Sequence, residues 1–227
     1  MNEYGNPVLE PKTQAVIDAR LPRIVPLKLT LLRQPFDHPD WVFELKHDGF
    51  RAIAYLSAAR RRLVSSRGTI FKTVNPLCEA LSKLPVRDAI LDGEIVCLDR
   101  KGNSLTNELL FRRGMPYFCA FDLLWLNGHD LRSLRFIERK ERLTELIKRS
   151  GSPSLLCADH VDGYGIDFFR TICKKNLQGI VAKHRASPYS ASAKWIKIEN
   201  PAYGQSQRRH ELLKRFTSTV KGGRKAG

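Results

Sequence analysis

Residues 44–51 read ELKHDGFR and place a lysine, two acids and an arginine within one short stretch. A lysine becomes a nucleophile once it loses its proton, which burial and neighbouring cations favour. Alternate residues of a strand face the same side, so Glu44 and Lys46 share a face. The stretch predicts either a lysine that holds or attacks an anionic substrate, or a solvated lysine beside a turn. Taken alone, the motif favours the solvated lysine.

Apolar runs flank this stretch at residues 41–43 and 53–56. An Asp-Gly pair between two such runs is the strongest short-range signal for a hairpin. We therefore expect two antiparallel strands joined directly at Asp48-Gly49.

Charged residues recur in other segments that read as strands. Residues 89–99 contain Asp92-Gly93-Glu94, and residues 116–126, almost continuously apolar, contain Phe121-Asp122. Further charges fall in or at the ends of segments 61–68 (Arg67), 178–183 (Lys183) and 194–198 (Lys197). A carboxylate in an apolar strand is costly unless it is paired or bound to a metal. Convergence of these residues on one cleft is the economical interpretation.

The sequence predicts both helices and strands to position these residues, so the fold class expected is α+β. Asn75 is predicted to cap a short helix over 75–84, with Pro76 at its first helical position. Residues 134–149 have the apolar stripe of an amphipathic helix, and another helix is expected to start near Gly165. Residues 155–159 are predicted as a strand, and residues 21–32 as an extended segment along the core.

The composition points to a polyanionic partner. The chain has 227 residues, 39 basic and 23 acidic, which gives a net charge of +16 and a pI near 9.9. Such a surplus favours nucleic acid over the alternative of a basic protein without such a partner. The five cysteines form no CxxC pair, which indicates no zinc site and a reducing compartment. We expect a cytoplasmic protein, nucleoid-associated if bacterial, because no apolar run or leader suits a membrane or export.

Three regions are expected along the chain. Residues 1–20 are predicted to be a flexible leader, and residues 21–204 the folded body. Residues 205–227 carry seven Lys and Arg residues against one acid, Glu211, and are predicted to be a basic tail. Such a tail can hold DNA electrostatically.

The order of the motifs resembles that of the ATP-dependent DNA ligases within the covalent nucleotidyltransferase superfamily. The segments concerned are KHDGFR, SSRG, LDGE, FDLL, QGIVAK and KWIK, in that order along the chain. The segments RASPY and WIKIENPAY are similar to small bacterial ligases, including the ligase domains of end-joining repair proteins. The resemblance implies a stand-alone nucleotidyltransferase (ATP-grasp-like) domain of antiparallel sheets flanked by helices.

The resemblance implies that Lys46 attacks the α-phosphate of ATP and forms a lysyl-AMP intermediate. Glu44 would then accept a hydrogen bond from the adenine amino group, and Phe121 would stack on adenine. Arg51 and Glu94 would hold the ribose.

Phosphate contacts are also implied. Lys197 would neutralise the α-phosphate, and Arg67 would contact the 5′-phosphate of a DNA nick. Lys183 is expected to lie either on the surface or facing a phosphate of ATP.

The resemblance implies Mg²⁺ or Mn²⁺ as well, with Glu94 and Gln178 at the metal positions. The family has glutamate where this chain has Gln178, which keeps an oxygen but loses the charge. It has a second lysine where this chain has Glu199, which by strand parity faces the same side as Lys197. A carboxylate ~5 Å from a phosphate costs on the order of 3 kcal/mol at an effective dielectric near 20.

No C-terminal OB-fold barrel is expected, because the residues after Pro201 are too few for five strands. The leading hypothesis is an adenylyltransferase that acts on DNA nicks or breaks, weakly or with a separate OB-fold or Ku-like partner. One alternative is a catalytically degenerate relative that binds DNA or nucleotide. Another is an RNA ligase or a capping-type nucleotidyltransferase.

Overall fold

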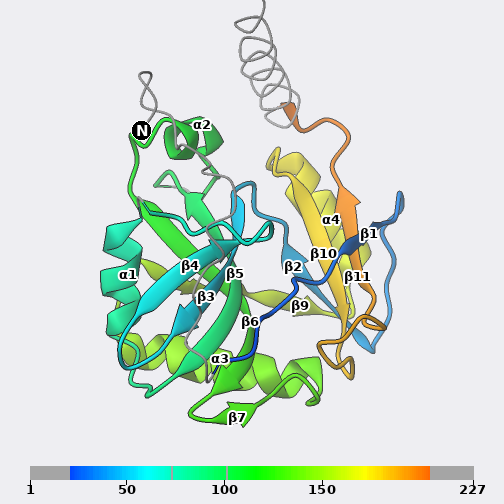
Figure 1. Cartoon of the computed structure of the whole chain (residues 1–227). Helices are drawn as coiled ribbons and strands as arrows, with labels where there is room; N and C mark the ends of the chain where they lie inside the picture. Colours follow the sequence, from blue (N-terminus) through cyan, green and yellow to red (C-terminus); the bar gives the residue numbers. More distant parts are fainter. Residues whose placement is uncertain (1–20, 73, 101, 205–227) are drawn as a thin grey trace, which may run out of the picture.

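A computed structural model of the chain describes residues 21–72, 74–100 and 102–204. The predicted leader at 1–20 and tail at 205–227 lie outside the described residues. Two β-sheets form the centre of the described part, and helices cover their outer faces (Figure 1). The α+β class expected from the sequence is therefore confirmed.

The first sheet has five strands and carries Lys46 at the end of one of them. Its order is β1 (Leu29–Leu31), β11 (Trp195–Glu199), β10 (Gly179–His184), β2 (Trp41–Leu45) and β9 (His160–Asp162). Only β1 and β11 run parallel among these pairs. The edge strand β1 continues an extended segment in which Leu21, Ile24 and Leu27 are buried, as predicted.

The second sheet has six strands. Its order is β4 (Arg61–Ser65), β3 (Phe50–Leu56), β5 (Ala89–Cys97), β6 (Pro116–Leu126) and β7 (His129–Asp130), and β8 (Leu155–Cys157) pairs with β6. The β6–β8 pair is parallel, and the others are antiparallel. Antiparallel sheets were expected, and each sheet is antiparallel except for one parallel pair of strands.

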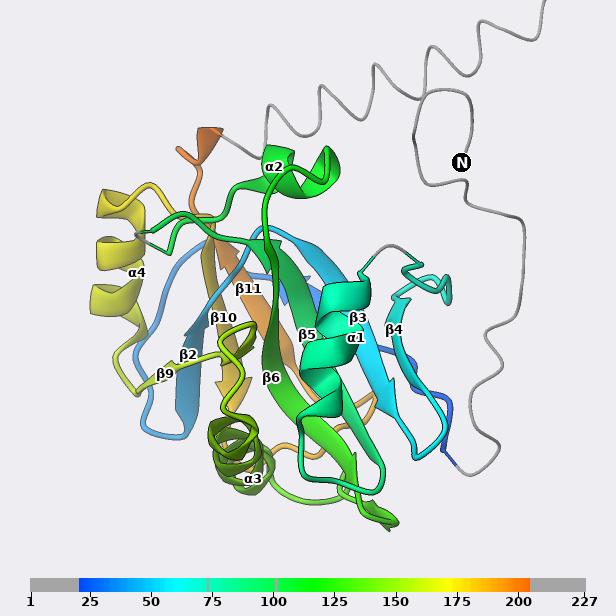
Figure 2. The same cartoon turned by 90° about the vertical axis from the view of Figure 1, so that its left-hand side faces the viewer.

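Four helices complete the described part. They are α1 (Asn75–Ser82), α2 (Thr106–Leu110), α3 (Phe136–Ser150) and α4 (Gly165–Lys174). Helices α1 and α3 pack on the six-stranded sheet, whereas α4 packs on the five-stranded sheet (Figure 2). The short helix α2 lies at one end of the molecule, away from α3.

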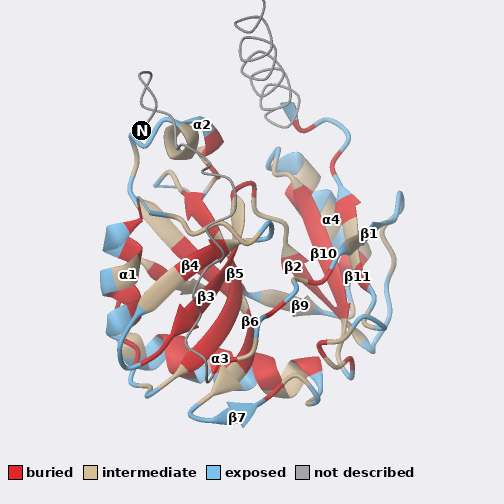
Figure 3. Cartoon of the chain, in the orientation of Figure 1, coloured by how far each residue is buried: buried red, intermediate tan, exposed pale blue. Residues whose placement is uncertain are grey.

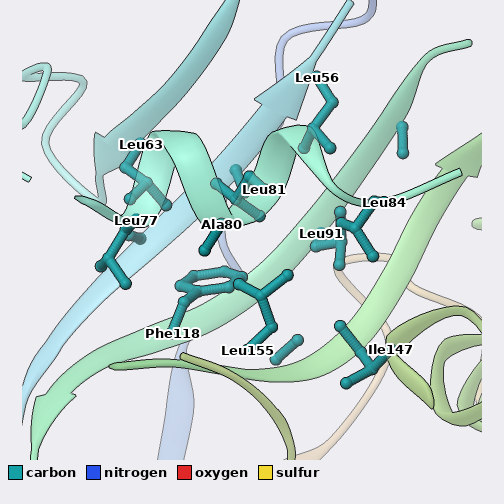
Figure 4. Packing of buried hydrophobic residues seen from close by; sticks show 14 of the residues in the cluster. Leu56, Leu63, Leu77, Ala80, Leu81, Leu84, Leu91, Phe118, Ile147 and Leu155 are labelled. Carbon is teal, nitrogen blue, oxygen red and sulfur yellow. The ribbon is translucent and has the colours of Figure 1, made fainter. Parts of the chain in front are cut away.

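Strand alternation divides the buried residues into separate cores. Ala52, Ala54 and Leu56 of β3 point towards α1, whereas Ile53 and Tyr55 point towards the five-stranded sheet. Figure 3 shows the buried residues concentrated in the strands and on the inner faces of the helices. In Figure 4 the leucines of α1 and the six-stranded sheet surround Phe118. The central strands of this sheet are therefore packed on both faces.

The hairpin predicted at Asp48-Gly49 is wrong. Strand β2 pairs with β10 and β9 in one sheet, and β3 pairs with β4 and β5 in the other. Gly49 is needed for close approach instead of a turn, since a Cβ there would lie 2.2 Å from the carbonyl oxygen of Ile95. Residues 46–49 therefore cross from one sheet to the other.

The cap predicted for the first helix is also wrong, by one residue. Val74 occupies the N-cap position without a side-chain cap, and Asn75 is already helical. The strand at 116–126 and the helix starting at Gly165 are confirmed, and the amphipathic helix lies at Phe136–Ser150. No helix among the described residues is both long and apolar enough to cross a bilayer.

Candidate active site

Lys46 lies where the sheet containing β2 and β10 ends. Its backbone N–H donates to the carbonyl oxygen of Gly179 at 2.9 Å, which extends the ladder by one residue beyond Leu45. Its side chain reaches Gln178, the residue before β10, and Nζ donates to Oε1 of Gln178 at 2.7 Å. The amine is thus held by a neutral amide at the rim of the two sheets.

The surroundings of Lys46 favour loss of its proton. Burial lowers the pKa of its amine from the ordinary 10.5, and the charge of Lys197 acts in the same direction. Glu94 and Glu199 oppose this effect, but the net direction of the pKa is downward. The side chain is only half-buried, so the amine remains within reach of a substrate. This is the state that a nucleophilic lysine requires.

Lys197 and Glu199 form an ion pair beside Lys46. Both lie on β11, and Lys197 Nζ donates to Glu199 Oε1 at 2.8 Å. The prediction that these two side chains face the same side of the strand is confirmed. Their side chains are 29% and 42% exposed, so the pair lies at the rim and is open to solvent. Glu199 therefore neutralises the cation expected to meet a phosphate.

A second group of charges, the inner network, lies beneath the rim and consists of Glu44, Lys140 and Lys183. Lys140 Nζ donates to one carboxylate oxygen of Glu44 and Lys183 Nζ to the other, each at 2.5 Å. All three residues are at most 2% exposed. Burial alone would raise the pKa of Glu44, but the two ammonium groups lower it below its usual value. The inner network therefore ties α3 to β2 and β10.

Lys183 is also surrounded by aromatic rings. Its Nζ lies 4.5 Å from the ring centroid of Phe121, 4.8 Å from that of Phe136 and 4.1 Å from that of Trp195. Aromatic faces attract cations most strongly where water is excluded. The expectation that Lys183 could lie on the surface is wrong, because it is buried between the two sheets.

Arg51 of β3 is held by Asp92 of β5, the neighbouring strand in the six-stranded sheet. Its Nε and one terminal nitrogen donate to the two oxygens of Asp92 at 3.1 and 2.7 Å, and Tyr189 Oη donates to Asp92 at 2.7 Å. Burial would lower the pKa of Arg51, but Asp92 raises it above its usual value. Arg51 Cζ lies 5.5 Å from the ring centroid of Phe121, which is half-buried. This guanidinium is therefore fixed beside the aromatic ring expected to stack on a base.

A second buried ion pair lies farther in. Arg139 of α3 donates two hydrogen bonds to Asp122, both at 2.8 Å, and both side chains are fully buried. The prediction that the carboxylates of the strands converge on one cleft is therefore wrong for Asp92 and Asp122. Both are fully buried, and each is paired with an arginine. Glu94, also on β5, is half-buried.

Asp48 anchors the segment that carries Lys46. Thr106 Oγ1, at the start of α2, donates to Asp48 Oδ2 at 2.8 Å. Tyr203 Oη is 3.4 Å from the same oxygen, and Asp48 itself is buried. The crossover between the sheets is thus attached to α2 and to the end of the described chain.

Arg67 lies in a tight turn after β4 and is exposed. Ser65 accepts a hydrogen bond from the backbone N–H of Gly68, whose φ of 83° suits a glycine. Two hollows on the surface, one lined by Arg135, His184 and Arg185 and one between α3 and residues 85–86, contain none of the predicted site residues.

The described residues offer few ligands for a metal ion. No group of three or more His, Cys, Asp or Glu side chains occurs among them in metal-binding arrangement. Of the two predicted positions, Gln178 accepts the hydrogen bond of Lys46, and Glu94 supplies a single carboxylate. They do not form an all-protein site. They suit Mg²⁺ only in the way it often binds, with one carboxylate, water and substrate phosphates.

Several site residues were not predicted from the sequence. Arg139 and Lys140 lie on the buried side of α3 between Phe136 and Leu143, three and four residues from the former. A pair of cations interrupting an apolar stripe at this spacing is the signal that would have identified them. Tyr189 ends the RASPY segment, and only its similarity to ligases drew attention to it.

Comparison with protein families gives a match over most of the chain. A family model described as ATP dependent DNA ligase domain matches residues 28–199. The multifunctional non-homologous end joining protein LigD of Pseudomonas aeruginosa is 29% identical over 208 residues, covering 87% of this chain and 25% of that protein. The SPbeta prophage-derived DNA ligase-like protein LigB of Bacillus subtilis is 27% identical over 191 residues, covering 79% and 68% respectively.

LigD of Mycolicibacterium smegmatis is 32% identical over 163 residues, or 69% of this chain and 21% of that protein. The chain thus spans a quarter or less of the length of the two LigD proteins. Among solved structures, the ligase domain of LigD from M. tuberculosis has a TM-score of 0.67 at 28% identity, covering 77% of this chain and 59% of that one. A mycobacterial DNA ligase D complexed with ATP and MES gives 0.65 at 28% identity, covering 77% and 60%.

Proposed function

The chain belongs to the ATP-dependent DNA ligase family, and we propose that Lys46 forms a covalent lysyl-AMP from ATP and passes the AMP to broken DNA. The observation that carries this proposal is the placement of Lys46. Its amine is half-buried at the rim of the two sheets, held at 2.7 Å by a neutral amide and lowered in pKa by burial.

The proposed reaction has three transfers. The uncharged Lys46 amine attacks the α-phosphorus of ATP, a P–N bond forms, the bond to the bridging oxygen breaks, and pyrophosphate and a proton leave. The AMP then moves to the 5′-phosphate of a nick, which restores the lysine. Finally the 3′-hydroxyl attacks the activated phosphate, and AMP departs as the strand is sealed.

Other residues are proposed to bind and orient the substrates. Phe121 would stack on adenine with Glu44 on the side of its amino group, and Arg51 and Glu94 would hold the ribose. Lys183, buried beside Glu44 and the ring of Phe121, would contribute its positive charge to binding of ATP.

Lys197 would neutralise the α-phosphate, and the exposed Arg67 would bind the 5′-phosphate at the nick. Glu94 is the carboxylate that would hold a divalent ion, Mg²⁺ or Mn²⁺, together with the phosphates of ATP, and such an ion would supply positive charge to neutralise them. All three steps depend mainly on positioning and on neutralised charge.

The LigD relatives are about four to five times as long as the matched region of this chain. Nicked or broken duplex DNA is the proposed substrate, in the cytoplasm and at the nucleoid of a bacterium. An OB-fold or Ku-like protein is the proposed partner. Two of the relatives are named end-joining proteins, which supports a role in DNA repair or recombination.

The test is covalent labelling. The protein is incubated with α-labelled ATP and Mg²⁺ or Mn²⁺, denatured, and analysed for label on the chain. We expect label from ATP that is lost in Lys46→Ala and kept in Lys194→Ala, a control at an exposed lysine of the same region. Absence of label with either metal would overturn the enzymatic proposal, and label from GTP in preference to ATP would favour the RNA-directed alternative.

A second candidate function is binding of DNA or nucleotide without catalysis. The ion pair between Lys197 and Glu199 favours it. Glu199 neutralises the charge of Lys197, the residue expected to contact the α-phosphate of ATP. Binding of ATP without covalent label, retained in Lys46→Ala, would select this candidate.

A further inference from the structure

The segment between α2 and β6 presents an unusual surface. Residues Phe111–Met115 form what we call the corner patch. Phe111 is 43% exposed and Met115 67%, which makes them two of the six large apolar side chains exposed among the described residues. Arg112 and Arg113 between them are exposed as well. Apolar and cationic side chains are therefore concentrated in five consecutive residues.

The backbone of the corner patch is held in a defined shape. The N–H of Arg113 donates to the carbonyl oxygen of Glu108, and that of Arg112 to Leu109, the two bonds of a Schellman motif. Gly114 packs against β5 so closely that a Cβ there would lie 2.2 Å from Cys97 Sγ. Arg113 Cζ lies 4.9 Å from the ring centroid of Phe111. The exposed side chains therefore project from an anchored backbone.

Arg112 occupies a position where glycine would be more stable. Its φ is 56°, in the left-handed region that a Schellman motif requires at this residue. The other non-glycine residues with positive φ in the described chain are Asn127 and Asn176, and asparagine tolerates this conformation well. Arginine is less favoured than glycine or asparagine in this conformation, so the backbone alone does not call for an arginine here.

The corner patch is connected to the candidate active site through α2. Thr106 at the start of α2 donates to Asp48, two residues after Lys46. Arg112 is six residues farther along, which places it within about 22 Å of Thr106 even for a fully extended chain. A duplex with its nick at Lys46 extends well beyond this distance in both directions.

We propose that the corner patch is a docking surface for duplex DNA, with Arg112 and Arg113 on backbone phosphates and Phe111 and Met115 against the sugar edges of the groove. The inference rests on the proposed function, since it takes DNA as the substrate. Arginines are frequent phosphate ligands, and apolar side chains frequently pack in the minor groove. Glu108 is the only acid between residues 106 and 116, and the chain has a net charge of +16.

The test measures binding of a fluorescent nicked duplex by anisotropy over a series of salt concentrations. In Arg112→Ala/Arg113→Ala we expect weaker binding and a salt slope smaller by about 0.9 for each phosphate that the variant no longer neutralises. The control is Arg142→Ala/Arg149→Ala, which removes the same charge from exposed positions of α3, at the opposite end of the molecule from α2 (Figures 1 and 2). The control should keep the wild-type slope, and Phe111→Ala/Met115→Ala should weaken binding without changing the slope.

Arg112→Gly separates docking from folding. Relief of the left-handed conformation should raise the Tm by about 2 °C, whereas loss of the guanidinium should weaken DNA binding. Weaker binding together with a lower Tm would indicate a structural role and overturn the proposal. So would equal binding and slope in the corner-patch and control variants.

Covalent labelling by ATP, without DNA, is measured on the same variants and should equal that of the wild type. If the wild type takes no label while the corner-patch variants lose DNA affinity, the proposed function fails and the docking surface stands. If label forms and DNA affinity is unchanged, the docking surface alone fails.

Discussion

The inner network and the rim contain charges of the same kinds in opposite circumstances. Around Glu44, one carboxylate is shared by two ammonium groups, and all three residues are at most 2% exposed. At the rim, Lys46 meets a neutral amide, and Lys197 and Glu199 form a pair that is open to solvent. The two groups meet at β2 and β10, whereas Lys140 comes from α3 and the Lys197–Glu199 pair from β11. They differ most clearly in depth.

This difference in burial determines how much each group contributes to folding stability. A buried charge that loses its partner costs several kcal/mol, so the inner network cannot change one residue at a time without loss of folding free energy. A solvent-exposed pair contributes about 0–1 kcal/mol, so residues at the rim can change with little effect on stability. Departures from the family pattern at Gln178 and Glu199 both lie at the rim, where they alter the surroundings of Lys46 directly.

The largest effect is expected from Glu44→Gln. This change leaves Lys140 and Lys183 buried without their shared carboxylate, and removal of one partner from a buried ion pair costs about 3–5 kcal/mol. We expect a loss of this size in the free energy of unfolding, measured by urea denaturation. Glu199→Gln, the matched change at the rim, should alter it by less than about 1 kcal/mol.

The pH dependence of the same variant provides a control. The pKa of Glu44 in the folded state is lowered below its ordinary 4.5. Its stabilising effect is therefore complete above pH 4.5 and is lost as the pH falls through the folded-state value. Glu44→Gln should lack this part of the acid destabilisation. Equal acid sensitivity in both proteins would contradict the assignment of Glu44 as the centre of the inner network.

A smaller loss is expected from Lys140→Met. Glu44 then keeps Lys183, so no charge is left unpaired, and the cost is that of one charge-assisted hydrogen bond, about 1.5–3 kcal/mol. Because Lys140 ties α3 to β2, hydrogen exchange in α3 should accelerate. A loss as large as that of Glu44→Gln would show that Lys183 alone cannot balance the carboxylate.

The sequence identified the family correctly but did not reveal which residues partner those of the candidate site. The motif order identified the family, which the match over residues 28–199 confirms, and strand parity placed Glu199 beside Lys197. The Asp-Gly signal failed because local turn preference carries no information about which sheet each strand joins. Gly49 is required by the carbonyl oxygen of Ile95, a contact between residues far apart in sequence. Lys140 was missed for the same reason, since its partner Glu44 lies 96 residues away.

At the rim, Glu199→Lys is expected to change activity more than stability. A carboxylate ~5 Å from the phosphate of ATP would repel it by about 3 kcal/mol at an effective dielectric near 20, and exposure of Glu199 reduces this further. We expect the rate of Lys46 adenylation to rise about tenfold, which corresponds to ~1.4 kcal/mol. The rate is measured with labelled ATP in single turnover, and the urea midpoint should stay nearly unchanged. A rate at or below that of the wild type would mean that Glu199 does not oppose the phosphate.

The smallest effect on stability concerns Lys46 itself. Its pKa is lowered by burial, so the folded state loses this proton at a lower pH than the unfolded state, whose value is near the ordinary 10.5. Between these two values the unfolded state binds more protons, and the free energy of unfolding therefore rises with pH. Lys46→Met should remove that gain, whereas Lys194→Met should keep it, as an exposed lysine has little to gain.

The same ionisation should appear in the chemistry. The rate of adenylation of the wild type should increase with pH and then reach a plateau, because only the uncharged amine attacks. The midpoint of this increase should lie below pH 10.5. In Gln178→Glu a carboxylate replaces the amide that accepts the hydrogen bond of Lys46, and an opposite charge at this distance raises a lysine pKa by about one unit or more. The midpoint should therefore move to higher pH while the inner network, and with it the urea midpoint, stays as it was. A midpoint that does not move would mean that Gln178 leaves Lys46 once ATP is bound, and the rim would then be rearranged by substrate in a way the inner network is not.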